Sequence, residues 1–260
     1  MRNVVILTCF FSSLIIAAYI SLWFYVAKKV EQRVDQLYYV EAPQFGVSFT
    51  SDNSREGIAG FPFWPYAGYK GDVTFPDGVS VNVRDMMIKP ALFDKESFKI
   101  IFPEGLSIKE LPSSKYISFD EVILDLKLNG GFPLGIKKTF MQEWYDSDGR
   151  IEVKNIKIFK DSIRPLLVEA SGNMSFTPDL QPFIEYNIRV VNPKDFVDYV
   201  FQDSGWPVPV KKVVSMLRPI VETDEKTGDF FIKTKFEIKN GTLSIGSVPF
   251  VPVPNVEWEE

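Results

Sequence analysis

The stretch LDLKLNG, residues Leu124–Gly130, places a leucine at every second position and ends on an Asn–Gly pair. A period of two puts the leucines on one face of an extended strand and Asp125 and Lys127 on the other. Asn–Gly is typical of a hairpin turn, because both central residues of a type I′ turn need φ > 0. The stretch therefore predicts a strand with one buried face and one hydrated face, as in antiparallel sheets.

The same alternation recurs along the body of the chain, from Phe45 onward. Its apolar positions include Val79, Val81, Val83, Phe98, Ile100, Phe102, Ile151, Val153, Ile156, Ile158, Tyr186, Ile188, Val190, Phe230, Ile232, Phe236 and Ile238. An extra residue around Asn155 predicts a β-bulge that keeps one face inward. Further hairpin signals are Asp77–Gly78, Asp148–Gly149 and Asn240–Gly241. We expect a mainly β fold, a long curved antiparallel sheet or meander with minor helical content.

Two helical patterns interrupt the strands, both in the C-terminal third. Asn192–Pro193 predicts a helix with an N-cap and a proline in its first turn, and Gly205 predicts its end. The second pattern, residues 208–218, is amphipathic and stops at Pro219. These helices either pack on the core of the body or form a lid over an apolar groove. The residues of the lid interpretation are Phe196, Tyr199, Val200, Val213 and Leu217.

The N-terminus contains an uncharged, largely apolar segment, Val4–Ala27, long enough for the ~20 residues that a membrane-spanning helix needs. Trp23 and Tyr25 lie near one end, where aromatic side chains favour the membrane–water interface. A cleavable signal peptide has a shorter apolar region, of about 7–15 residues. We therefore expect one uncleaved transmembrane helix. Residues 1–42 are predicted to form this anchor with a short helical stalk, and residues 43–260 a β-rich domain.

A helical stripe follows the predicted anchor, with Val30, Val34 and Tyr38 among its apolar positions. Two interpretations fit it: a stalk that holds the body away from the membrane, or a helix packed onto its own domain. The charges leave the orientation open. Lys28–Lys29 would keep the body in the cytoplasm by the positive-inside rule. A body without cysteine is instead compatible with an oxidising compartment.

The composition excludes the common catalytic and metal centres. The 260 residues include no histidine and one cysteine, which excludes Ser-His-Asp triads and histidine-ligated zinc or haem. The Asp146–Gly149 segment lacks the third early ligand and the distal glutamate of a calcium loop. A formal net charge of −5 without a basic stripe argues against nucleic-acid binding. We expect a non-enzymatic protein without a cofactor or a metal.

Two segments stand apart by their prolines and aromatic residues. The first, GIAGFPFWPYAGY at Gly57–Tyr69, gathers Phe61, Phe63, Trp64, Tyr66 and Tyr69. Two interpretations fit it: a corner folded into the core, or an aromatic loop at the membrane interface or at the mouth of an apolar groove. The second, Ser247–Glu260, carries three prolines and predicts a last edge strand that continues as an extended tail.

Two short motifs carry a resemblance to a known family. Gly60–Phe63 reads GFPF, and Asn240–Pro249 reads NGTLSIGSVP. With the order of anchor, strands and late helices, they resemble the uncharacterised bacterial domain-of-unknown-function family twenty-one twenty-five. The resemblance implies an inner-membrane anchor with its body in the periplasm, and it implies no catalytic residue. A looser similarity links the tail to envelope proteins of the AsmA kind, whose curved sheets are thought to hold lipid.

These observations lead to two functions of different classes. In the first, the membrane-anchored body holds a lipid or another hydrophobic ligand in an apolar groove of its sheet. In the second, the core is fully packed, and the protein is a scaffold for other envelope proteins that bind its tail or a strand edge. A hydrolase based on carboxylates alone would need a polar cleft with two carboxyl groups about 5–9 Å apart.

Overall fold

The structure is a computed structural model of the chain. It describes residues 19–21, 23–32, 34–44, 46–50, 58–60, 65–75, 78–91, 94, 96–109, 116–130, 138–161, 164–201, 221–225, 227–253, 255–256 and 258.

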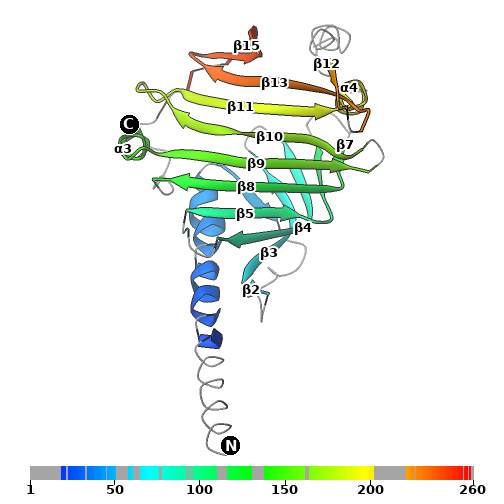
Figure 1. Cartoon of the computed structure of the whole chain (residues 1–260). Coiled ribbons are helices and arrows are strands. Elements are labelled where there is room, and N and C mark those ends of the chain that lie inside the picture. The colour runs from blue at the N-terminus through cyan, green and yellow to red at the C-terminus, as the bar shows by residue number, and fades with distance from the viewer. Residues whose placement is uncertain are drawn as a thin grey trace, which may run out of the picture.

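Among these residues, fifteen strands form one antiparallel sheet (Figure 1). They are β1 (Ser48–Thr50), β2 (Ile58–Ala59), β3 (Tyr66–Thr74), β4 (Ser80–Pro90), β5 (Ser97–Phe102), β6 (Leu106–Lys109), β7 (Tyr116–Phe119), β8 (Glu121–Asn129), β9 (Arg150–Lys160), β10 (Arg164–Phe176), β11 (Pro182–Val191), β12 (Val221–Thr223), β13 (Phe230–Lys239), β14 (Thr242–Ile245) and β15 (Val248–Pro252). The main path is β1-β3-β4-β5-β8-β9-β10-β11-β13-β14-β15. The prediction of a mainly β fold with a long antiparallel sheet is confirmed.

Pairing between strands aligns apolar side chains into rows that cross the sheet. One row runs from β4 to β11 and comprises Ile88, Ile100, Leu124, Ile156, Ala170 and Ile188. The next row runs from β5 to β14 and comprises Phe98, Leu126, Val153, Gly172, Tyr186, Phe236 and Ile245. Directly paired side chains lie on the same side of a sheet. One face, here called the inner face, is therefore apolar over most of the strands.

The bulge predicted around Asn155 is confirmed. Asp125 of β8 pairs with Asn155, but the next residue, Leu126, pairs with Val153. The extra residue in β9 is therefore Lys154. In a regular strand Val153 and Ile156, which are three positions apart, would point to opposite sides of the sheet, because side chains alternate with a period of two. The bulge thus keeps the apolar rows continuous.

The sheet divides at a corner. β4 pairs with β5 near its C-terminal end and with β6 near its N-terminal end, and β7 pairs with β6. The corner lies where β5 turns into β6 and β7 turns into β8, and Gly105 occupies this turn at a φ of 74°. A Cβ atom at Gly105 would lie 1.8 Å from the carbonyl oxygen of Phe119, so the two turns pack backbone against backbone.

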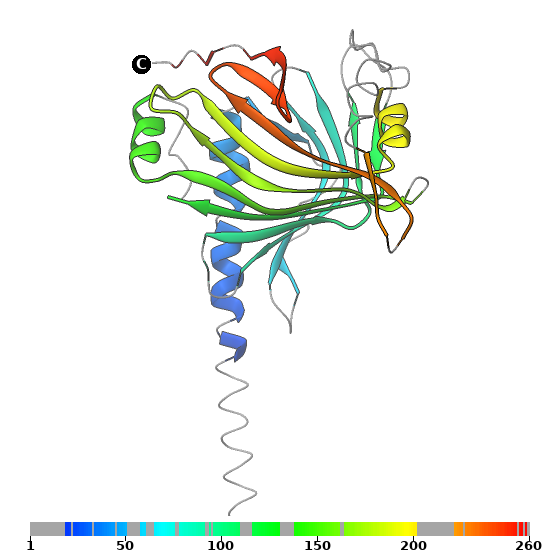
Figure 2. The same cartoon turned by 45° about the horizontal axis from the view of Figure 1, so that its top comes forward.

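The N-terminal helix, residues 19–36 apart from residues 22 and 33, packs against the inner face. It continues through a π-helical turn, η1 (Leu37–Glu41), and a short helix, α2 (Ala42–Gln44). Val30, Val34 and Tyr38 belong to the same core cluster as inner-face residues such as Val122 and Ile232. Figure 2 shows the sheet curling beside this helix. Of the two interpretations of the stripe, the structure shows the helix packed onto its own domain.

Most of the predicted anchor, Val4–Ala27, lies outside the described residues. Within the part that is described, no helix combines the length and the apolar character needed to cross a bilayer. Trp23 and Ala27 are buried, whereas Tyr19, Phe24 and Tyr25 are exposed. The anchor itself stays a prediction.

The hairpin signals have different outcomes. Asn240 and Gly241 have φ values of 50° and 66° and join β13 to β14, as predicted. The hairpin expected at Asp148–Gly149 is wrong, because this pair ends a helix, α3 (Lys138–Asp146). There the N–H of Gly149 donates to the carbonyl of Trp144 at 2.8 Å, and Asp148 has a φ of 59°. A left-handed residue after a helix is a common C-terminal cap, and it uses the same residue types as a hairpin turn.

The helix predicted to begin at Asn192–Pro193 is confirmed as α4 (Pro193–Phe201). The second predicted helix, residues 208–218, lies outside the described residues. No sequence signal predicted α3, which packs Met141 and Trp144 against Leu180 and Trp258 in a second, smaller core cluster.

Candidate functional site

The inner face contains a partly exposed apolar strip. Its side chains have intermediate burial and belong to neither core cluster. We call these residues the inner strip: Leu126, Met174, Ile184, Tyr186, Phe236, Ile238, Leu243 and Ile245. They lie on β8, β10, β11, β13 and β14. β9 lies between β8 and β10, and its Val153, which pairs with Leu126, is buried. Apolar side chains that a folded protein leaves partly accessible are candidates for a binding surface.

The strip is long enough to hold a lipid chain. Neighbouring strands lie about 4.8 Å apart, so the five strand-to-strand steps from β8 to β14 span roughly 24 Å. One leaflet of the hydrocarbon core of a bilayer is only about 15 Å thick. The rows cross the strands in the direction of the N-terminal helix axis (Figure 1). An extended acyl chain could therefore lie along the strip, parallel to this helix.

Buried clusters close the strip at both ends of the strands. At one end, Val122, Val168, Val190 and Ile232 belong to the main core cluster, and Phe196 and Tyr199 of α4 pack against this cluster. At the other end, Trp144 of α3 belongs to the second cluster. Its ring meets Phe176, and the ring of Phe176 meets that of Trp258 at a centroid distance of 5.5 Å.

Leu180 at this second end has a strained backbone. It has a φ of 57° and is 1% exposed. A leucine in the left-handed region costs about 1–2 kcal/mol. Its buried side chain offsets this cost because it packs between Met141 and Trp144.

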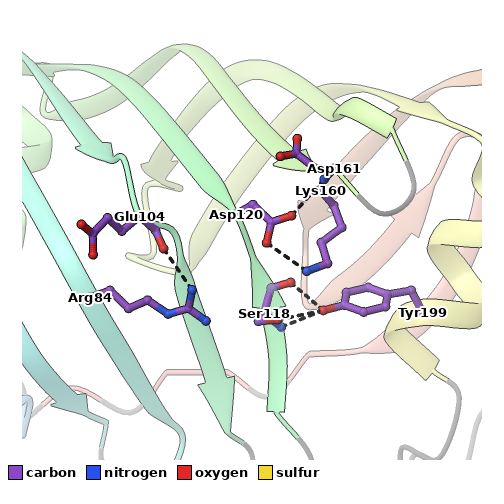
Figure 3. A network of polar contacts seen from close by, with 7 residues as sticks. All are labelled: Arg84, Glu104, Ser118, Asp120, Lys160, Asp161 and Tyr199. Carbon is purple, nitrogen blue, oxygen red and sulfur yellow. Dashed lines mark hydrogen bonds and ion pairs between the residues drawn. The ribbon is translucent and has the colours of Figure 1, made fainter.

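A tyrosine attaches α4 to the free edge of β7. The hydroxyl of Tyr199 accepts a hydrogen bond from the N–H of Ser118 at 2.9 Å and donates to the carbonyl of Ser118 at 2.5 Å (Figure 3). β7 pairs with β6 on one side, so these two backbone groups lie on its other side. Unpaired strand edges invite aggregation or further pairing. Tyr199 therefore caps this edge and holds α4 in place.

Lys160 links α4 to the corner of the sheet. Its ammonium lies 3.0 Å from the carboxylate of Asp120 and 5.5 Å from the ring centroid of Tyr199. The N–H of Asp161 donates to the other carboxylate oxygen of Asp120 at 2.9 Å. Burial opposes ionisation of Asp120, but these hydrogen bonds and the charges of Lys160 and Arg84 outweigh it and hold the pKa of this carboxyl below its usual value.

We predict that Asp120→Asn destabilises the protein in a pH-dependent way. Because the pKa of Asp120 is lower in the folded protein than its ordinary value of 3.8, the ionised carboxylate stabilises the fold at pH values above 3.8. This stabilisation is lost as the pH falls through the folded-state pKa. Asp120 is 37% exposed, so solvent screening limits the expected loss at neutral pH to about 1 kcal/mol. Urea unfolding at neutral and at acidic pH measures it. Asp148→Asn, at a 79% exposed carboxylate, is the control and should be neutral. An equal loss at both pH values would contradict the prediction.

The sheet also carries a hollow of about 500 Å³. It is lined by Glu169, Ala170, Ser171, Asn187, Ile188, Arg189, Lys233, Thr234 and Lys235. Most of its charges are already paired: Arg189 lies 3.1 Å from Asp224, and Lys235 lies 3.1 Å from Glu185. Lys157 also reaches Glu169, at 3.7 Å. This local neutralisation makes the hollow a weaker candidate than the inner strip.

The structure places the predicted site residues as follows. Tyr69 is buried in the main core, where its ring meets Tyr38 and Phe49 and its hydroxyl donates to the backbone carbonyl of Asp72 at 2.9 Å. Its pKa is raised to about 12 by burial, with a contribution from the nearby charge of Asp72. Tyr66 is half-buried beneath the ammonium of Lys89. Neither tyrosine belongs to the inner strip, so for Tyr69 the structure shows a corner folded into the core.

Of the predicted lid residues, Phe196 and Tyr199 come together at the edge of the main core. The residues that lie outside the described part of the chain are Phe61, Phe63, Trp64, Val213, Leu217 and the side chain of Val200. The inner strip itself was not predicted as a site. Its residues alternate in the sequence like any sheet residues, and nothing in that pattern separates a covered row from an open one.

Metal-binding groups do not gather in the described residues: no cluster of three or more cysteine, aspartate or glutamate side chains there could hold an ion.

Residues 105–254, more than half of the chain, match a family described as uncharacterised proteins conserved in bacteria (DUF2125). The chain belongs to this family. The matched span begins at Gly105 in the corner and includes β6 to β15. The DUF2125 region thus contains the whole inner strip, Tyr199 and Lys160. Of the two motifs that carried the resemblance, Asn240–Pro249 lies inside the match and Gly60–Phe63 outside it. The similarity to AsmA-type proteins stays a prediction.

No curated protein and no solved structure matches this DUF2125 chain.

Proposed function

We propose that this protein is a non-enzymatic, membrane-anchored envelope protein that holds the acyl chain of a lipid against the inner strip. The observation that carries the proposal is the inner strip, a partly exposed apolar surface between two closed ends. Water contact with such a surface is unfavourable by about 25 cal/mol per Å². A bound acyl chain would remove this surface from water, and its flexibility suits rows of leucine, isoleucine and phenylalanine.

The proposed location is the inner membrane, with residues 4–27 as a single span and the body in the periplasm. It rests on the uncharged segment Val4–Ala27 and on the exposed aromatic residues Tyr19, Phe24 and Tyr25 of the N-terminal helix. Tyrosine and other aromatic residues favour the membrane–water interface. The helix would hold the body, and with it the inner strip, close to a source of lipid.

The scaffold alternative has less support, because the C-terminal tail contacts its own body. The N–H of Val256 donates to the side-chain carbonyl of Gln181 at 2.8 Å, and the indole of Trp258 donates to Leu180 at 3.0 Å. Pro249 and Pro252 lie in β15, at the edge of the sheet. Proline removes the N–H donors that an added strand would need.

Photocrosslinking in intact cells tests the proposal with the full chain. A photoreactive amino acid at Phe236 should form lipid adducts, because this position lies in the inner strip. The same photoreactive amino acid in place of Lys235, the preceding position on β13, faces outward and should form few lipid adducts. Mass spectrometry identifies the adducts. A reporter that is active only in the periplasm, fused after Glu260, tests whether the body lies in that compartment. Equal lipid labelling at both positions, or none at Phe236, would contradict the proposed function.

A further inference from the structure

The hollow of about 500 Å³ opens on the outer face of the sheet. Its lining consists of three consecutive residues on each of β10, β11 and β13. If it opened inward, the next inner-face side chains along these strands, those of Tyr186, Val190 and Phe236, would line it, and none of them does. The sheet therefore separates the hollow from the inner strip.

Short and long side chains alternate across these strands and create the hollow. Ser171 and Asn187 are directly paired and have short side chains. Longer side chains flank them: Lys235 pairs with Asn187 on its other side, and the adjacent row across the three strands consists of Glu169, Arg189 and Lys233. The hollow thus has a hydroxyl and an amide on its floor and a rim that is mainly cationic.

The lining carries an excess of positive charge. Arg189, Lys233 and Lys235 are cationic, and Glu169 is the carboxylate among the described lining residues. Lys157, which does not line the hollow, pairs with Glu169 at 3.7 Å, and Lys235 pairs with a neighbouring glutamate at 3.1 Å. These ion pairs leave Arg189 and Lys233 as the cations to be accounted for.

Arg189 and Lys233 converge on one aromatic ring. Cζ of Arg189 lies 4.5 Å, and Nζ of Lys233 lies 5.2 Å, from the ring centroid of the buried Phe231. The two cations are also directly paired on β11 and β13, and like charges directly opposite each other are destabilising. Asp224 offsets part of this repulsion, because it accepts a hydrogen bond from Arg189 at 3.1 Å. Among the described residues, no carboxylate forms an ion pair with Lys233.

We propose that the hollow binds a phosphate monoester group between Arg189 and Lys233. Such a group carries a charge of about −1.5 to −2 at pH 7 and offers three acceptor oxygens. The guanidinium has five N–H donors, of which Asp224 uses one, and the ammonium has three. The amide of Asn187 supplies a further donor from the floor. A tetrahedral anion can accept from these three directions at once, whereas a planar carboxylate offers two oxygens in one plane.

Isothermal titration calorimetry of the full chain in a non-ionic detergent tests this inference. The probes are glycerol 3-phosphate, glycerate and glycerol, which share a three-carbon skeleton and differ in their charged group. The wild type should bind glycerol 3-phosphate at one saturable site, more tightly than glycerate, and should not bind glycerol. Lys233→Gln should weaken phosphate binding about tenfold or more, the effect of a hydrogen bond to a charged group. Lys233→Arg should retain the binding.

Lys239→Gln is the matched control. Lys239 is exposed like Lys233, lies on the same strand and the same face, and has its ammonium 6.0 Å from the ring centroid of Phe183. It does not line the hollow, so its substitution should leave the affinity unchanged. Equal losses in the two glutamine variants would show a diffuse effect of surface charge and overturn the inference. An absence of saturable binding, or tighter binding of glycerate, would overturn it as well.

Nanodiscs distinguish a lipid phosphate from a soluble one. The full chain is reconstituted with phosphatidylcholine alone or with added phosphatidic acid, whose headgroup is a phosphate monoester. Competition between phosphatidic acid and glycerol 3-phosphate would identify a lipid headgroup as the ligand, and unchanged titrations would identify a soluble ester; both results support the phosphate site. The inner strip lies on the other face of the sheet, so failure of the phosphate site would leave the proposed function intact.

Discussion

Gly105→Ala should destabilise the protein by about 4 kcal/mol or more. The new Cβ would lie 1.8 Å from the carbonyl oxygen of Phe119 and 2.9 Å from the carbonyl carbon of Asp120. Both are backbone atoms, so no side-chain rotation can relieve the overlap. About 1 kcal/mol comes from the left-handed conformation, since φ is 74°. The remainder comes from forcing apart two packed turns, an overpacking effect at the upper end of the usual range.

Gly228→Ala is a matched control for this effect. Gly228 has the same φ of 74°, but nothing lies within 4 Å of the Cβ that alanine would add. The Gly228→Ala substitution should therefore destabilise the protein only by the about 1 kcal/mol that a left-handed backbone conformation costs alanine. Urea unfolding of both variants, followed by tryptophan fluorescence, measures the difference. Equal losses for the two variants would show that the corner does not depend on close backbone packing.

The corner also positions the polar contacts around α4. Ser118 and Asp120 flank Phe119, whose carbonyl contacts Gly105. A shift of this backbone would move the groups that bind Tyr199 and Lys160. We therefore expect Gly105→Ala to loosen α4 as well as the sheet.

Local periodicity was sufficient to predict β4, β5, β8, β9, β11 and β13 and their faces, but it gave no set of alternating residues for β10, the longest strand. Leu124, Leu126 and Leu128 share the inner face as expected, and the bulge near Asn155 was readable because it changed the spacing of the apolar residues. The failures have a physical reason as well. Asp–Gly gives the chain a left-handed residue, which serves a hairpin or a helix C-terminus equally well. At Asp148 the choice depended on α3, whose apolar residues Met141 and Trp144 are buried by distant partners.

The candidate site depended on information that periodicity does not contain. Ile232 and Phe236 occupy equivalent positions on β13, yet Ile232 is buried in the main core and Phe236 stays partly exposed. The difference arises from what packs over each position: the main core cluster at one end of the strand, and neither cluster in the middle. A contact between residues 81 positions apart, such as Tyr199 with Ser118, likewise has no local signal.

Phe236→Asp should abolish most binding of an acyl probe, with a loss of about a hundredfold. The substitution removes the apolar contact of a phenylalanine, worth about 1.5–3 kcal/mol, and places a carboxylate beside hydrocarbon. A hundredfold loss corresponds to about 2.7 kcal/mol. Titration of a fluorescent fatty acid ester into the full chain measures the change.

Phe183→Asp provides the matched control. Phe183 lies on the neighbouring strand β11 with the same intermediate burial, but it points to the outer face. The two variants share the chemical change and the loss of a half-buried ring, so both should show a similar decrease in thermal stability. The proposed function confines acyl binding to the inner strip, so Phe183→Asp should keep the affinity within about twofold of the wild type, a smaller free-energy change than the loss of one hydrogen bond. Equal losses of binding would mean that the probe responds to general loosening of the sheet, and the inner strip would then not be the acyl site.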